Sequence, residues 1–281
     1  MPKRCISAIA VLAVLFTASS SAAGPPAEDA VLSAENEIDA LWQKIDSYSA
    51  SIHVTTKLRS MTMRLRTQGQ GELACMKTEG KLLYRVKLDT TTSMGGGGFE
   101  PRAESSVKDY GVEEKKTHVF DGEYHYLQTV MYGKPSVVKI EPMPCFLFGM
   151  VPGSGRPIFE ELHKDYDLTL LPEEEVDGQQ AYAFRLESKL KYPDVAVTAT
   201  GAKLPSQGKA WFSKNTGLPL RLVILFPEDK PHRTVEYKDI KINPSLDPIL
   251  FEYTPPEGAP VVEPPPREAK QPDNEPKKAS S

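Results

Sequence analysis

Alternation of apolar and polar residues along short segments is the feature that most constrains the fold of this chain. Every second side chain is apolar, or the β-branched Thr56, in residues 52–57, 61–66, 82–89 and 182–187. A period of two is typical of β-strands with one buried and one wet face, the usual arrangement in antiparallel sheets. Turn-forming residues separate these segments, as at Asp177-Gly178. The pattern therefore predicts a mainly β (α+β) protein built on a long antiparallel sheet.

The C-terminal third of the chain gives two finer predictions about the strands. Residues 215–217 have turn-forming character and lie between two apolar segments, which predicts a β-hairpin. Further on, the apolar residues change face by one position after Tyr237. Such a change predicts a β-bulge near Lys238-Asp239.

Two helices are expected beside the strands. Ser33 is a suitable N-cap residue, and an apolar stripe at helical spacing follows it as far as Tyr48. Pro157 suits the first position of a second, shorter helix. We therefore expect an amphipathic helix over residues 33–48 and a short helix that starts near Pro157.

The N-terminal segment has the layout of a secretory signal peptide. Lys3 and Arg4 precede an apolar run over residues 6–18, and residues 21–23 are similar to a cleavage site. The run is shorter than the roughly 18–20 residues that a membrane-spanning helix requires. We expect residues 1–23 to be removed from a periplasmic or secreted protein. An uncleaved N-terminal anchor is the alternative.

Composition sets the remaining boundaries. We expect residues 24–33 to be a linker, residues 34–263 a single folded domain, and residues 264–281 a proline-rich tail. The tail is polar and has no aromatic residue, so we expect it to be disordered. Glycine-rich residues 95–98 predict a flexible loop. A phosphate-binding loop is not expected there, because the Lys-Ser/Thr of such a loop does not follow them.

Two cysteines remain once the signal peptide, which contains Cys5, has been removed. In an exported protein, an even remainder predicts a disulfide, here between Cys75 and Cys145. The alternative is two unpaired buried thiols, since the sequence does not show that the two residues meet.

His118, Asp121 and His125 are the natural candidates for a catalytic or metal-binding group. They flank a predicted turn, but their spacing matches none of the zinc patterns, and the polar faces of a hairpin explain them equally well. No nucleophile elbow is recognised. The formal net charge of −4 gives no reason to expect nucleic acid as a partner. We therefore expect no catalytic site, metal or cofactor.

The C-terminal region carries a distinctive order of features. The strand that ends in Asn243 is followed by a short turn, by Phe251 and by the Pro-x-Gly of residues 256–258. This order resembles the closing segment of the LolA-like outer-membrane lipoprotein-sorting family, and the turn at residues 120–124 also fits it. The resemblance covers roughly residues 34–262. It depends on turns and packing positions rather than on catalytic groups.

The resemblance implies a strongly bent, unclosed antiparallel β-barrel, with an N-terminal helix and a short helix that plugs the concave face. In that family the concavity holds acyl chains of lipids. Arg85 and Arg185, weak candidates for the cavity arginine of the carriers, fall on polar strand faces. The apolar side chains that we expect to line such a cavity are Leu82, Tyr84, Val86, Leu88, Trp211, Leu222, Ile224, Ile158, Phe159 and Leu162.

The expected function is therefore binding of a lipid or an acylated lipoprotein by an exported monomer, with an envelope protein as a possible partner. Two helices cannot cover the concave face of so long a sheet, so the sheet either closes into a filled barrel or leaves an apolar lining for a ligand. Two alternatives stay open. One is a periplasmic sensor or protein-interaction module on the same fold, and the other is a hydrolase whose site is not recognised.

Overall fold

The computed structural model describes residues 28–59, 63–78, 81–96, 111–141, 158–189, 207–226 and 230–263. The helices are α1 (Glu28–Trp42), α2 (Ile158–Asp165) and the 3-10 helix η3 (Pro248–Phe251). The strands are β1 (Ser47–Arg59), β2 (Met63–Thr78), β3 (Lys81–Gly96), β4 (Val112–Phe120), β5 (His125–Met131), β6 (Lys134–Ile140), β7 (Tyr166–Val176), β8 (Gln179–Ser188), β9 (Gln207–Ser213), β10 (Pro219–Phe226), β11 (Lys230–Ile242) and β12 (Val261–Val262).

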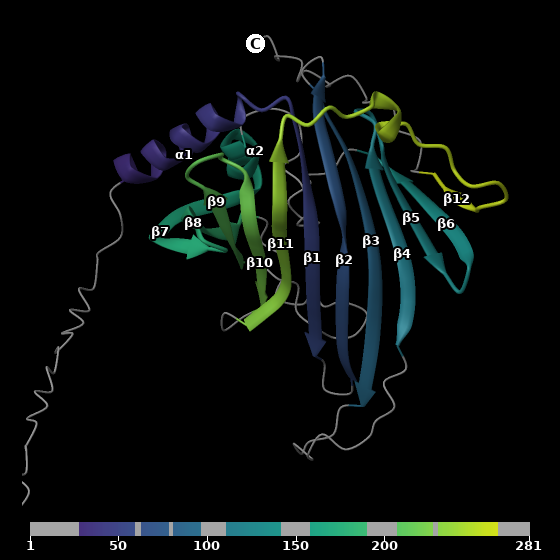
Figure 1. Cartoon of the computed structure of the whole chain (residues 1–281). Coiled ribbons are helices and arrows are strands. Elements are labelled where there is room, and N and C mark those ends of the chain that lie inside the picture. Colours follow the sequence, from purple (N-terminus) through teal and green to yellow (C-terminus); the bar gives the residue numbers. More distant parts are fainter. Residues whose placement is uncertain are drawn as a thin grey trace, which may run out of the picture.

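The described strands form one bent, open sheet, which curls from the broad β1–β6 part towards β7–β9 (Figure 1). The strand order is β12-β6-β5-β4-β3-β2-β1-β11-β10-β9-β8-β7, so β7 and β12 are its edges. Neighbouring strands pair antiparallel, except for β12, which pairs parallel to β6 through Val261 and Val262. The predicted fold class, an unclosed and mainly antiparallel β-barrel with two helices, is confirmed.

Both finer predictions about the C-terminal strands are confirmed. β9 and β10 pair antiparallel around a turn that ends at Gly217, whose φ is +70°. An added Cβ at Gly217 would also lie 2.7 Å from the backbone oxygen of Ile38 in α1, so the turn has room only for glycine. The bulge lies where the register between β1 and β11 shifts, and there Asp239 has a φ of +51°.

The prediction of the first helix was right in type and wrong in its bounds. α1 begins at Glu28, inside the segment expected as a linker, and ends at Trp42 rather than Tyr48. Glu28 and Asp29 occupy its first turn, where the helix dipole stabilises negatively charged side chains. It ends early because Asn243 Oδ1 accepts hydrogen bonds from the backbone N–H groups of Asp46 and Ser47, at 2.8 and 3.2 Å, and so holds this segment at the start of β1.

Other expectations concern segments at the limits of the described residues. Residues 95 and 96 pair with Arg64 and Met63 in the β2–β3 ladder, so the glycine-rich loop does not start at residue 95 as expected. The predicted signal peptide, the predicted tail and Cys145 lie outside the described residues. Among the described residues, no helix is long and apolar enough to cross a membrane.

The described residues pack into two apolar clusters, one on each face of the sheet. The concave-face cluster joins α1 and α2 to β1–β4 and β8–β11, with Ile38, Trp42 and Phe212 among its buried members. The outer-face cluster is smaller and lies over β7–β10. Its members are Val176, Ala181, Ala183, Trp211, Leu220, Val223 and Leu225. Alternate residues of the same strands therefore contribute to different clusters, as a period of two requires.

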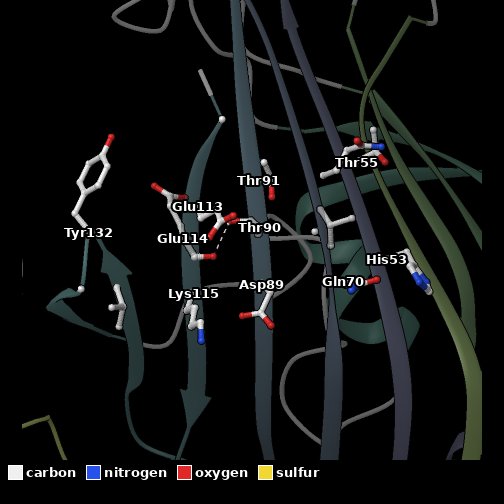
Figure 2. Close-up of a pocket in the computed structure, with 16 residues that line it drawn as sticks. His53, Thr55, Gln70, Asp89, Thr90, Thr91, Glu113, Glu114, Lys115 and Tyr132 are labelled. Atoms are coloured by element: carbon white, nitrogen blue, oxygen red, sulfur yellow. Dashed lines mark hydrogen bonds between the residues drawn. The ribbon is translucent and has the colours of Figure 1, made fainter. Parts of the chain in front are cut away.

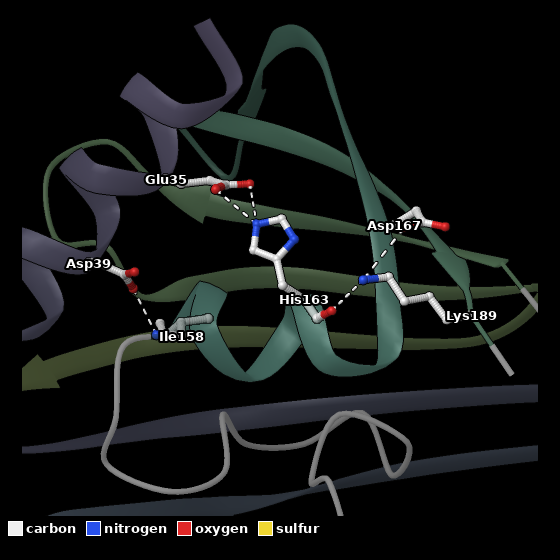
Figure 3. A network of polar contacts seen from close by, with 6 residues as sticks. All are labelled: Glu35, Asp39, Ile158, His163, Asp167 and Lys189. Carbon is white, nitrogen blue, oxygen red and sulfur yellow. Dashed lines mark hydrogen bonds and ion pairs between the residues drawn. The ribbon is translucent and has the colours of Figure 1, made fainter. Parts of the chain in front are cut away.

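Polar contacts fix α2 against α1 (Figure 3). Asp39 Oδ1 accepts a hydrogen bond from Ile158 N, the first residue of α2, at 2.7 Å. The buried carboxylate of Glu35 lies 3.0 and 3.1 Å from His163 Nε2. Lys189 Nζ donates to His163 O at 2.5 Å. These contacts set the position from which the apolar side of α2 enters the concave face.

Candidate functional site on the concave face

Most of the residues expected to line a cavity come together in the concave-face cluster. Leu82, Tyr84, Val86 and Leu88 follow one another on the same face of β3 and are at most 7% exposed. Leu222 on β10 joins them in this cluster. From α2, the cluster receives Ile158, Phe159 and Leu162. The predicted short helix and its apolar side therefore face the predicted strand surface.

Of the other two expected lining residues, Trp211 lies on the outer face, whereas Ile224 lies on the concave face outside the cluster. Trp211 belongs to the outer-face cluster, where its Nε1 donates to Glu174 Oε2 at 2.9 Å. β9 is apolar on both faces, so the sequence around Trp211 does not show which face it takes. Ile224 is half-buried and shares the concave face with Leu222 and with its cross-strand partner Arg233, although it is not a member of the cluster. Trp211 is therefore not part of the concave-face surface.

Towards β4 and β5 the concave face becomes polar. His118 is the cross-strand partner of Val86, and His125 is the partner of Phe120, so both imidazoles lie on the concave face. Tyr84 Oη and His125 Nδ1 are 2.8 Å apart, and the His125 ring stacks on Phe120 with centroids 4.4 Å apart. Burial lowers the pKa of His125 to about 4, so it is neutral at pH 7.

His118 lies in a cationic neighbourhood. Burial, followed by the charges of Arg233 and Lys116, lowers the pKa of His118 to about 4. The Lys116 ammonium is balanced by the Glu114 carboxylate, with Nζ and Oε2 2.7 Å apart. Asp121, the third residue of the histidine group, instead accepts hydrogen bonds from two backbone N–H groups of its own turn, at 2.8 Å each. Among the described residues, no three His, Cys, Asp or Glu side chains lie close enough to hold a metal.

Arg233 is the residue of this site that the sequence analysis missed. It pairs with Thr56 of β1 and alternates with Val235 and Tyr237, both buried on the concave face. Its Nε is fully buried and has no hydrogen-bond partner among the described residues. Burial lowers the pKa of its guanidinium from the ordinary value. The alternation around Val235 and Tyr237 was visible in the sequence and could have identified Arg233 as a concave-face residue.

Arg85 and Arg185 lie on the face opposite the concave cluster, as their strand positions predicted. Arg85 pairs with Ala74 and Val119, and its Nη1 donates to Leu250 O at 3.0 Å. Arg185 donates to Gln207 Oε1 at 3.2 Å. Neither of them faces the concave cluster.

A polar depression of about 1100 Å³ lies over β1–β5 (Figure 2). Its lining includes His53, Thr55, Gln70, Asp89 and Lys115, whose positions alternate with those of the concave-face residues. Charged and amide groups lie among Val54, Val130 and Tyr132 in this lining, so an acyl chain placed here would desolvate polar groups as well as bury apolar area. The concave face is therefore the stronger candidate for a lipid site.

Cys75 is completely buried in the concave-face cluster. Its predicted partner Cys145 lies outside the described residues, so the disulfide stays a prediction.

No family model matches this chain, and no curated protein matches it either. Solved structures with a similar backbone trace include an uncharacterised conserved protein from Thermus thermophilus. It has 13% identity and a TM-score of 0.46, and the match covers 84% of this chain and 99% of that one. LprF from Mycobacterium bovis has 11% identity and a TM-score of 0.38, and covers 80% and 99% of the two chains.

A LolA superfamily protein from Nitrosomonas europaea has 12% identity and a TM-score of 0.32, with 79% and 97% of the two chains covered. At these identities and TM-scores, the similarity concerns the backbone trace and does not extend to ligands or partners.

Proposed function

We propose that this protein binds the acyl chain of a lipid or an acylated lipoprotein against the concave face of β1–β3, as an exported carrier. One observation supports the proposal above the others. The concave-face cluster is a continuous buried apolar surface, and it lies on a sheet that does not close around it. A closed barrel would enclose its apolar residues permanently, whereas an open sheet leaves a route from the edge to this surface.

The free energy of acyl-chain burial is sufficient for such a function. Each CH₂ group removed from water stabilises the complex by about 0.8 kcal/mol. A sixteen-carbon chain therefore supplies on the order of 10 kcal/mol before ordering costs. The site needs no catalytic group, which distinguishes it from the hydrolase alternative.

In this proposal an acyl chain displaces the apolar side chains of α2 from the concave face. Phe159 packs against Phe184 and Phe212, with ring centroids 5.0 and 5.5 Å apart, and Ile158 and Leu162 are buried beside it. The helix has only eight residues, and hydrogen bonds to Asp39 and Glu35 join it to α1. An acyl chain that displaced these side chains would take over apolar contacts that α2 makes in the ligand-free protein.

The variant Val86→Glu tests this site. Val86 is completely buried at the centre of the β3 face, so a carboxylate there must lose its solvation or draw water into the site. We expect loss of uptake of a fluorescent fatty acid by this variant. The matched control is Lys87→Glu, which places the same charge on the exposed side of the same strand.

Thermal unfolding of each variant is measured together with uptake. A folded Val86→Glu protein that takes up the fatty acid as well as wild type would refute the proposal. If this variant does not fold, wild-type uptake decides, together with mass spectrometry of lipids extracted from the purified protein. A wild-type protein with neither uptake nor bound lipid would contradict the carrier function.

A further inference from the structure

Arg233 is half-buried with its Nε shielded from water, and the described residues supply no counter-charge to its guanidinium. The structure places no carboxylate of these residues in an ion pair with Arg233; the group that raises its pKa through charge is Tyr237. Removing an ionised side chain from water without a partner is costly, and proteins pair or hydrogen-bond such groups. Within the described part of the chain, the guanidinium of Arg233 therefore has no counter-ion.

The neighbouring groups make this imbalance larger. The charge of Lys116 is already matched by Glu114 at 2.7 Å. His118 is neutral at pH 7, because its pKa is about 4, and the positive charge of Arg233 is one cause of that value. His232 Nδ1 donates a hydrogen bond to Lys57 O at 3.0 Å, and burial together with the charge of Arg233 lowers the pKa of His232. Arg233 thus keeps a net positive charge at the concave surface.

The apolar and charged parts of this face are continuous. Arg233, Val235 and Tyr237 follow one another on the concave side of β11. Val235 and Tyr237 belong to the same cluster as Val86 and Leu88. An amphiphile with its tail on the cluster can thus place its head at the guanidinium without leaving the surface.

We propose that Arg233 binds the anionic head group of an amphiphilic ligand whose acyl tail lies on the concave-face cluster, and this inference rests on the proposed acyl-chain binding. The shared chemistry is an oxyanion, either the carboxylate of a fatty acid or the phosphate of a lysophospholipid. A guanidinium suits both, because its planar donors match two oxygens of such a group at once.

Three sixteen-carbon probes separate the head from the tail: palmitate, palmitoyl lysophosphatidic acid and the neutral alcohol hexadecanol. Affinity is measured by displacement of a fluorescent fatty acid from wild type and from Arg233→Gln. Loss of a hydrogen bond to a charged group weakens binding by about tenfold or more, so we expect that loss for an anionic probe. Hexadecanol should bind both proteins within about twofold, since the variant removes no apolar contact.

Arg221→Gln is the matched control. Arg221 lies on the outer face, paired with Glu236 at 3.3 Å and near the Trp211 ring, so its loss should leave all three affinities unchanged. The two anionic probes distinguish a carboxylate from a phosphate head group. The probe with the head group of the natural ligand should bind wild type more tightly and should lose more affinity in Arg233→Gln.

The possible results separate the two proposals. The role of Arg233 would be overturned if the wild-type protein bound hexadecanol as tightly as both anionic probes. It would also be overturned if Arg233→Gln lost affinity for all three probes equally. Acyl-chain binding would stand in both cases. Wild type that binds none of the probes would overturn acyl-chain binding itself. Ligand-free Arg233→Met should melt no lower than wild type, because it removes an unpaired charge; a clear drop would show that the arginine is a structural residue.

Discussion

Acidification from pH 7 to pH 5 is expected to destabilise this protein through His118 and His125. Both take up a proton near pH 6.5 in the unfolded chain, whereas burial lowers the pKa of each to about 4 in the folded protein. Between these values the unfolded state binds more protons. The stabilisation due to the neutral imidazoles is therefore complete above pH 6.5 and is lost as the pH falls towards 4.

The expected effect is large compared with the usual stability of a domain. A change of one pKa unit corresponds to about 1.4 kcal/mol, and these shifts make each histidine lower the free energy of unfolding by about 2 kcal/mol between pH 7 and pH 5. Both together remove about 4 kcal/mol, against a typical total of roughly 5–15 kcal/mol. Protonated His118 would also meet the charges of Arg233 and Lys116.

Urea unfolding at pH 7 and pH 5, followed by the fluorescence of buried Trp42 and Trp211, measures this difference. His118→Gln and His125→Gln should each reduce the loss on acidification by about half, because glutamine does not titrate. His53→Gln is the control, since His53 is exposed on the outer face. The reasoning would be refuted by a double variant that loses as much stability as wild type between the two pH values.

Three further outcomes are expected. Gly71→Ala should lower the free energy of unfolding by about 2 kcal/mol or more, because its Cβ would lie 1.8 Å from a backbone oxygen of β3, whereas Gly111→Ala, with its closest contact at 3.4 Å, should change the melting temperature little. Asp39→Ala should cost about 1 kcal/mol in chemical unfolding by removing the acceptor at the start of α2. Thiol counting on the unreduced, denatured protein should find Cys75 and Cys145 joined, and two free thiols would contradict the bridge.

The sequence by itself determined the local conformation of much of this chain. Alternation in residues 82–89 fixes which side chains of β3 share a face, because successive residues of a strand point to opposite sides. The turn before Gly217 and the bulge at Asp239 were visible for the same reason, since each interrupts a pattern within a few residues. Ile158 and Leu162 were likewise assigned to one side of a short helix from their spacing alone.

Tertiary structure decided what these local patterns could not. α1 ends at Trp42 because Asn243, almost 200 residues away, holds Asp46 and Ser47 at the start of β1. Trp211 lies on the outer face because β9 is apolar on both sides, so its orientation depends on pairing with β8 and β10.

The importance of Arg233 also became visible only in the folded sheet. The sequence places it on the same strand face as Val235, but its partial burial and its neighbours His118 and Tyr237 come from the curvature that brings distant strands together. A period of two is a property of one strand, whereas burial and charge balance depend on every strand that surrounds the side chain.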